Sequence, residues 1–193
     1  MPIVLKESSG GGSAVPPGTH LGLCYRITYM GTQPDTGFGE KAKLSIAWEI
    51  PGETVTVEGK QMPMSISKTY TMSLNKKAVL RQDLAAWRGR DFTKEELEGF
   101  KLASILGKPC LVTVELNDAG KSRVSKVTSI MKGMTVPAVV NPLVEYSIED
   151  GKNEVYKALP EWLRKACDAC IEWTSPKPAA STTPTAEADD VAF

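Results

Sequence analysis

The feature of this sequence that most limits the possible folds is the run Lys41–Ile50, in which apolar and polar side chains alternate. A period of two places successive side chains on opposite faces of an extended chain, which is typical of a β-strand with one buried face. The face predicted to point into the core consists of Ala42, Leu44, Ile46, Trp48 and Ile50. The face predicted to point outward consists of Lys41, Lys43, Ser45, Ala47 and Glu49. We therefore expect a strand that ends at the turn Pro51-Gly52.

Two further strands are predicted, one on either side of this run. Residues 20–30 also alternate, and their two predicted faces are Leu23, Tyr25, Ile27 and Tyr29, with Cys24, Arg26, Thr28 and Met30 opposite. Residues 55–73 form a third β region, which is interrupted near Gly59 and Pro63. Its polar face is predicted to consist of Ser65, Ser67, Thr69 and Thr71. The first part of the chain is therefore predicted to be β-structure.

Helical signals follow the third β region. Asn75 is predicted to cap a helix over residues 76–88, and Gly89 marks the end of that helix. The segment Thr93-Lys-Glu-Glu96 has the pattern of a capping box, which predicts the start of a second, short helix. A third helical turn is predicted before Pro109. We therefore expect a helical insertion after the third strand.

Two more strands complete the order of elements. Residues 110–116 and 121–131 are predicted strands, and residues 117–120 have the composition of a hairpin turn. Three strands, a helical insertion and two strands are the order of the OB-fold, a five-stranded Greek-key barrel whose face and loops bind oligonucleotides. We therefore expect an all-β core with helical insertions, specifically an OB-fold with the helix between strands three and four, followed by a C-terminal helix that opens at Pro160.

Length and composition favour a single domain with extensions. The chain has 193 residues, of which 41% are hydrophobic, and this is enough for one core of ordinary size. The expected parts are a flexible lead-in (1–18), an OB-fold domain (19–135), a C-terminal extension with a helix (136–173) and a disordered acidic tail (174–193). The 23 basic and 23 acidic side chains cancel, but the acidic tail leaves the body mildly positive.

The apolar segments and the cysteines of the chain both bear on its compartment. No stretch approaches the roughly 18 apolar residues of a membrane span, and the first residues lack the pattern of a secretory signal, so we expect a cytoplasmic protein with no membrane partner. Cys24 and Cys110 are scattered, which fits a reducing compartment. Cys167 and Cys170 have the spacing of half a zinc site, but they also fit the buried face of a helix, which we favour. We therefore expect no metal.

Sequence motifs of the common enzyme classes are missing. The chain lacks a phosphate-binding loop with its lysine, a dinucleotide-binding glycine pattern and a nucleophile elbow. Its one histidine, His20, follows the predicted flexible lead-in. We therefore expect a protein that is not an enzyme, with no catalytic residues and no cofactor.

The last residues have the composition of a tether with a recognisable tip. From Thr174 the chain is rich in proline and small polar residues, which cannot bury enough apolar surface to offset the entropy of ordering. The expected partner-binding residues of the tip are Glu187, Asp189, Asp190 and Phe193. A basic pocket could pair with the carboxylates while an apolar slot takes the ring and a cation holds the terminal carboxylate. The alternative is a frayed acidic terminus without a role.

Two segments resemble known families. The proline-rich tether with acidic residues and Phe193 resembles the tail of bacterial single-stranded DNA-binding proteins and of phage-encoded ones, in which the tip recruits replication and repair enzymes. Residues 93–134, with Leu106-Gly-Lys-Pro-Cys110 and Lys132-Gly-Met134, are similar to a stretch found in small phage proteins of replication and recombination modules. Some of those proteins bind single-stranded DNA through an OB-fold. The resemblance implies single-stranded DNA and replication or recombination enzymes as partners, and the host cytoplasm as the location.

Binding of single strands without sequence preference needs cations for the backbone and flat side chains for the bases. Lys41 and Lys43 are the first-ranked cationic candidates. The others are Arg26, Arg123, Lys126 and Lys121. The stacking candidates are Tyr29, Phe38 and Tyr70. For the two tyrosines, packing in the core is an equally good explanation of their positions.

We therefore expect a protein that coats and protects single-stranded DNA during phage replication or recombination and recruits enzymes through its acidic tail. The alternative is a protein-interaction adaptor of a phage replication or recombination module that does not bind nucleic acid. A continuous basic surface over Arg26, Lys41 and Lys43 would favour DNA binding, and an apolar patch there would favour the adaptor. The sequence is compatible with a monomer or a homodimer.

Overall fold

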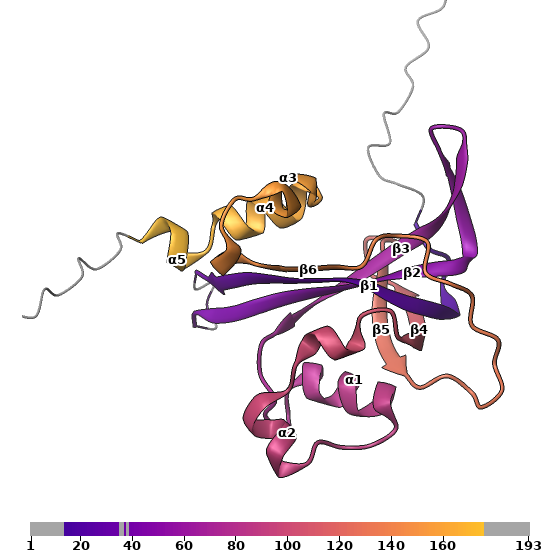
Figure 1. The fold of residues 1–193 in the computed structure, drawn as a ribbon, viewed down its shortest axis with the longest axis horizontal. Helices are drawn as coiled ribbons and strands as arrows, with labels where there is room; N and C mark the ends of the chain where they lie inside the picture. The colour runs from indigo at the N-terminus through magenta and orange to yellow at the C-terminus, as the bar shows by residue number, and fades with distance from the viewer. Residues whose placement is uncertain (1–13, 35–36, 38, 176–193) are drawn as a thin grey trace, which may run out of the picture.

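The structure is a computed structural model that describes residues 14–34, 37 and 39–175. Its centre is a six-stranded sheet with the path β3-β2-β1-β4-β5, and β6 lies beside β1 (Figure 1). The strands are β1 (Gly18–Gln33), β2 (Lys41–Val57), β3 (Lys60–Thr71), β4 (Pro109–Leu116), β5 (Ser122–Thr128) and β6 (Val144–Ser147). All neighbours on this path are antiparallel, whereas β6 runs parallel to β1.

Helices lie on both sides of the sheet. Between β3 and β4 the chain forms α1 (Val79–Arg88), α2 (Lys94–Gly99) and the 3₁₀-helix η1 (Leu102–Ile105). After β6 it forms the 3₁₀-helix η2 (Ile148–Asp150), α3 (Glu154–Ala158), α4 (Glu161–Asp168) and α5 (Ile171–Thr174). Figure 1 shows α1 and α2 on one side of the sheet and α3 and α4 on the other. A mostly antiparallel β core with a helical insertion after the third strand is therefore confirmed.

The alternation predicted for residues 41–50 places the correct side chains in the core. Leu44, Ile46, Trp48 and Ile50 all belong to the main hydrophobic cluster. Trp48 is completely buried, and its ring centroid lies 6.0 Å from that of Trp87 in α1. The apolar face of β2 therefore forms the centre of the core, as the sequence predicts.

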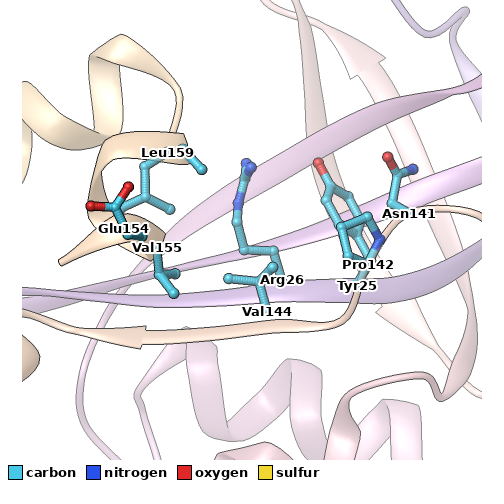
Figure 2. Close-up of a pocket in the computed structure, with 9 residues that line it drawn as sticks. Tyr25, Arg26, Asn141, Pro142, Val144, Glu154, Val155 and Leu159 are labelled. Carbon is cyan, nitrogen blue, oxygen red and sulfur yellow. The ribbon is translucent and has the colours of Figure 1, made fainter.

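The opposite face of β2 is buried from Ser45 to Glu49, and for these residues the predicted exposure is wrong, whereas Lys41 is exposed and Lys43 is half-buried. Ser45 and Ala47 are each 1% exposed, and Glu49 is 0% exposed. The Glu49 carboxylate accepts hydrogen bonds from the backbone N–H groups of Val140 and Asn141 at 2.8 Å each, and from the Asn141 side-chain amide at 2.7 Å. The C-terminal segment therefore covers this side of the sheet, and Figure 2 shows Asn141 and Pro142 beside β1.

A β-bulge changes the side-chain faces of β1. Cys24 pairs with Trp48 and Ile27 pairs with Ile46, so Cys24 and Ile27 both face the core, while Leu23 pairs with Glu49. The register shifts between Cys24 and Arg26, so one extra residue separates the two halves of the strand. The predicted grouping of Leu23 with Ile27 on one face is therefore wrong, because strict alternation does not continue through a bulge.

The turn signals at Gly59 and Gly89 are confirmed, but the predicted strand end at Pro51-Gly52 is wrong. β2 continues to Val57, with a register shift between Ile50 and Thr54 where it passes this dipeptide. Glu58 and Gly59, with φ of 49° and 79°, form the two-residue turn that joins β2 to β3. Gly89 ends α1 with φ of 70°, as predicted. Asn75 does not cap α1, which begins at Val79 after Ala78, because the Asn75 carbonyl instead accepts a turn hydrogen bond from the Ala78 N–H.

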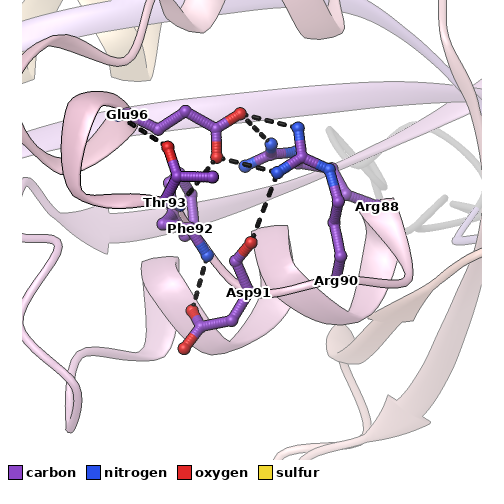
Figure 3. Close-up of polar contacts among 6 residues, drawn as sticks. All are labelled: Arg88, Arg90, Asp91, Phe92, Thr93 and Glu96. Carbon is purple, nitrogen blue, oxygen red and sulfur yellow. Dashed lines mark hydrogen bonds and ion pairs between the residues drawn. The ribbon is translucent and has the colours of Figure 1, made fainter.

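The predicted capping box of α2 forms and also carries two ion pairs. Thr93 Oγ1 accepts from the Glu96 N–H at 3.3 Å, and Glu96 Oε2 accepts from the Thr93 N–H at 3.0 Å. The same carboxylate pairs with Arg88 and Arg90, as Figure 3 shows. Arg88 lies against the rings of Phe92 and Phe100, so the cluster fastens α2 to the end of α1.

This cluster predicts a pH-dependent contribution to stability. Hydrogen bonds from Arg90, the Thr93 N–H and Arg88 lower the pKa of Glu96 from 4.5 to about 2. A carboxyl group whose pKa falls on folding stabilises the protein fully above its unfolded pKa. The contribution should therefore be lost as the pH falls from about 4.5 to about 2. Urea midpoints of the parent and Glu96→Gln should differ at pH 7 and converge near pH 2, whereas Glu98→Gln, an exposed change on the same helix, should show no such convergence.

The C-terminal segment contains more structure than the sequence suggested. β6, η2 and α3 precede Pro160 in the extension that was expected to contain one helix, and the helix expected to open at Pro160 is two helices, α4 and α5. Cys167 and Cys170 are buried there in a second hydrophobic cluster with Tyr156 and Leu163. In the described ranges no helix is long and apolar enough to cross a membrane, and no group of three or more potential metal ligands occurs.

Candidate functional site

A cationic pocket lies where β2 and β3 meet the segment leading into α1. Its volume is about 610 Å³. Three lysines line it, namely Lys43 from β2, Lys68 from β3 and Lys77 from the turn before α1. The neutral polar groups that line it are Thr69, Thr71, Ser73 and Asn75. This combination of ammonium groups, hydroxyls and an amide is suited to hold an anion.

Strand register brings the polar groups of the pocket together. Lys43 pairs with Thr71 across the β2–β3 ladder, and Lys43 Nζ donates to Thr71 Oγ1 at 2.8 Å. Thr69 precedes Thr71 on the same face and is exposed. Lys77 is exposed in the turn before α1. Lys43, the lysine predicted from strand parity, is half-buried beside the predicted Ser/Thr face, and Lys77 adds an exposed cation.

Lys68 contributes less positive charge to the pocket than the other two lysines. Its ammonium group pairs with Asp83 Oδ2 at 2.7 Å and donates to the Ser125 carbonyl at 3.1 Å. The Tyr70 hydroxyl donates to the same Asp83 oxygen at 2.8 Å. An ammonium group that already shares a carboxylate attracts a further anion less strongly. The cations of the pocket with the most charge to offer are thus Lys43 and Lys77.

The structure removes Tyr70 from the stacking candidates. Its side chain is 3% exposed and belongs to the main hydrophobic cluster. Burial, followed by the neighbouring Asp83 carboxylate, raises the pKa of Tyr70 well above its ordinary value. The ring therefore has no face open to a base, and the alternative of core packing is correct.

Tyr29 lies in an acidic environment. It is half-buried and lines a pocket together with Glu145, Glu149 and Asp150. Burial raises the pKa of Tyr29, and the carboxylates of Glu172 and Glu149 raise it further. Such surroundings repel a phosphate backbone, so Tyr29 is a poor contact for nucleic acid in this structure. Phe38, the third stacking candidate, lies outside the described residues.

Arg26 does not share the pocket of Lys43. It lines a different one, between β1 and the C-terminal segment, with Tyr25 and Val144 (Figure 2). Lys41 is exposed at the start of β2. Between the positions of Arg26 and Lys43, on the same side of the sheet, Ser45 and Ala47 are covered. The predicted continuous basic surface over Arg26, Lys41 and Lys43 is therefore interrupted, because the side chains between Arg26 and Lys43 are buried.

The remaining basic candidates lie on the β4–β5 hairpin. Lys121, Arg123 and Lys126 are all exposed, with Lys121 in the turn and the other two on β5. Arg123 makes one long contact, 3.5 Å, with Glu115 of β4. These three side chains form a separate group of cations, and none of them lines the Lys43 pocket. The tail residues Glu187, Asp189, Asp190 and Phe193 lie outside the described residues.

Sequence reasoning found Lys43 and the Ser/Thr face of β3 but missed two of the three lysines. Lys68 pairs with the core-facing Ile46, on the side of β3 opposite the Ser/Thr face, and still lines the pocket. Lys77 was assigned to the interior of a helix that in fact begins at Val79. The signal that could have found Lys77 is its position directly after the end of the Ser/Thr-rich strand.

Comparison with known proteins does not assign the chain to a family. No protein-family model matches the chain, and no curated protein sequence matches it. The function must therefore be argued from the fold and from the chemistry of the pocket.

Proposed function

We propose that the chain is a non-catalytic single-stranded DNA-binding protein whose strand-binding surface is the β2–β3 face. The observation that carries the proposal is the cationic pocket, in which Lys43 and Lys77 accompany the hydroxyls of Thr69 and Thr71. Ammonium groups neutralise phosphates, and hydroxyl groups donate hydrogen bonds to phosphate oxygens. A nucleic-acid backbone is thus the ligand that matches both kinds of group.

The strand order supports an OB-type barrel as the scaffold. β1 pairs with both β2 and β4, and α1 lies between β3 and β4 in the chain. The contact of Lys68 with the Ser125 carbonyl links the two ends of the sheet path, β3 and β5. In OB-folds the oligonucleotide crosses the face of strands two and three, which is the face that carries this pocket. We therefore place the bound strand across β2 and β3.

The chemistry of the pocket favours backbone contacts over base contacts. Tyr70, the aromatic residue nearest the two lysines in sequence and register, is buried. Affinity should thus come mainly from release of counterions around neutralised phosphates, which carries little sequence preference. This is the behaviour of a protein that coats strands of many sequences.

The biological role that fits this chemistry is protection of single-stranded DNA during phage replication or recombination. In that role the acidic tip, residues 187–193, would recruit replication or recombination enzymes in the cytoplasm of the host. Both assignments rest on the family resemblance of the tail and of residues 93–134. A homodimer or a monomer could perform them, because one chain supplies the whole cationic pocket.

The double variant Lys43→Gln/Lys77→Gln should weaken binding of labelled oligo-dT and make it less sensitive to salt. Each lysine that neutralises a phosphate of a single strand contributes about 0.7 to the slope of log K against log salt, so the magnitude of the slope should fall by about 1.4. Fluorescence anisotropy at several salt concentrations measures this slope.

The matched control for this variant is Lys165→Gln. Lys165 is an exposed lysine of α4 that pairs with Glu161 at 2.7 Å and does not line the Lys43 pocket. Its replacement should leave the slope unchanged. If the double variant kept the parent slope, or if the control lost as much, the strand would not run over Lys43 and Lys77.

A further inference from the structure

A second pocket is formed between β1 and the C-terminal segment. Its volume is about 460 Å³. Apolar walls come from Pro142 before β6, Val144 in β6 and Val155 and Leu159 in and after α3. Figure 2 shows Arg26 of β1 between these apolar groups. The pocket is thus mostly apolar, with Arg26 and Glu154 as its charged lining residues, and it shares no lining residue with the Lys43 pocket.

Within residues 14–34, 37 and 39–175, no carboxylate pairs with the guanidinium group of Arg26. It is half-buried and lies 5.3 Å from the centroid of the Tyr25 ring, and it makes no hydrogen bond or ion pair with the residues that the structure describes. Removal from water lowers the pKa of Arg26. A half-buried guanidinium is usually paired, because its fixed fork matches a carboxylate. This arrangement points to a carboxylate that comes from outside the described residues.

Glu154, the one carboxylate that lines this pocket, is engaged elsewhere. It lies at the start of α3, and its oxygen pairs with Lys157 on the same helix. It makes no ion pair with Arg26. A ligand that combines an acidic group for Arg26 with apolar groups for the walls would match the pocket.

The chain carries such a segment beyond the described residues. Residues 187–193 combine three carboxylates with Val191 and Phe193. The described chain ends just after α5, which packs on β1 in the same C-terminal segment as α3 and α4. Residues 176–186 connect it to the acidic residues, and a flexible chain of that length has an r.m.s. end-to-end distance of about 20 Å. Tethering of this kind gives an effective concentration of about 1 mM, at which a weak contact forms.

We propose that residues 187–193 dock in the Arg26 pocket of their own chain, with a side-chain carboxylate on Arg26 and apolar side chains against Val144 and Val155. Docking would withhold these residues from a partner enzyme until the enzyme competes for them. The inference concerns the Arg26 pocket alone and holds whether or not Lys43 and Lys77 bind DNA. It places the acidic segment away from the DNA-binding surface.

The test compares methyl NMR signals of Val144, Val155 and Leu159 in the full chain with those in Glu187→Gln/Asp189→Asn/Asp190→Asn. We expect the signals to differ between the two, and the difference to vanish in an Arg26→Gln background. A peptide of residues 185–193 added to the tail variant should move the same signals, and Arg26→Gln should weaken its binding about tenfold, the loss expected for a charge-assisted hydrogen bond. Val155→Asp, a change at an exposed position, should repel the peptide without disturbing the fold.

The control is Lys43→Gln, which should leave these signals and the binding of the peptide unchanged. Identical signals with and without the tail charges, or peptide binding that survives both pocket variants, would overturn the proposal. So would binding that depends on Lys43 instead, because the segment would then lie at the DNA-binding surface. A signal change that grew with protein concentration would place the segment of a second copy in the pocket and would contradict docking within one chain. Oligo-dT binding, measured on the same variants, reports on the DNA-binding proposal separately.

Discussion

Replacing Glu49 with alanine should destabilise the protein by about 3 kcal/mol, because buried donors that lose a charged acceptor pay their desolvation cost. Glu49 is 0% exposed, and its carboxylate accepts three hydrogen bonds from Val140 and Asn141. Those bonds tie the C-terminal segment to β2. The variant should therefore show a lower urea midpoint and earlier protease cleavage near residue 140, and these two measurements check the prediction.

The matched control is Glu115→Ala. Glu115 is an exposed carboxylate on β4 with one long contact to Arg123, so its loss should change stability by less than about 0.5 kcal/mol. Equal urea midpoints for the two variants would mean that the Glu49 contacts do not fasten the C-terminal segment.

The second large effect is expected at Trp48. Truncation of this completely buried ring to alanine should cost about 3–5 kcal/mol, because the cavity left beside Trp87 cannot close fully. Trp48→Phe should cost less than Trp48→Ala, since a smaller aromatic ring still fills part of the space. The phenylalanine also removes an indole N–H that is buried without a partner among the described residues. Urea unfolding followed by far-ultraviolet circular dichroism gives both values.

Trp162→Ala provides the comparison for these variants. Trp162 lies on α4 and is 46% exposed. Its truncation should change stability by less than about 1 kcal/mol. If Trp48→Ala were as mild as Trp162→Ala, β2 would not lie at the centre of the core.

Local sequence patterns predicted the elements that depend on side chains close together in the sequence. The alternation in residues 41–50 placed Leu44 and Ile46 in the core, and the Thr93 capping box predicted the start of α2. Each of these signals depends on side chains within a few residues of one another. The sequence therefore carries the β core and the helical insertion.

Elements that depend on distant contacts could not be predicted in the same way. β6 has four residues, and its pairing with β1 joins parts of the chain more than 100 residues apart. The Glu49 carboxylate is hydrogen-bonded by the N–H groups of Val140 and Asn141, and no sequence pattern near Glu49 predicts these donors. The bulge at Tyr25 similarly appears only once β1 pairs with β2.

In the candidate site, too, local features were predicted and features that depend on distant contacts were not. Lys43 was found because strand parity is local, whereas Lys77 depends on where α1 begins. Strand parity grouped Arg26 with Lys43, because the sequence does not show that Ser45 and Ala47 between them are buried and that Arg26 lines a separate pocket. Tyr70 looked equally suited to stacking and to the core until the hydrogen bond with Asp83 fixed its place.

The measurement that tests the central claim most directly is an anisotropy titration of labelled oligo-dT with the full chain at low and moderate salt. The proposed function predicts saturable binding at low salt that weakens steeply as salt rises, and weaker binding to a duplex of the same length. No binding to oligo-dT even at low salt would contradict the claim. The adaptor that contacts only proteins would then be the better account of this chain.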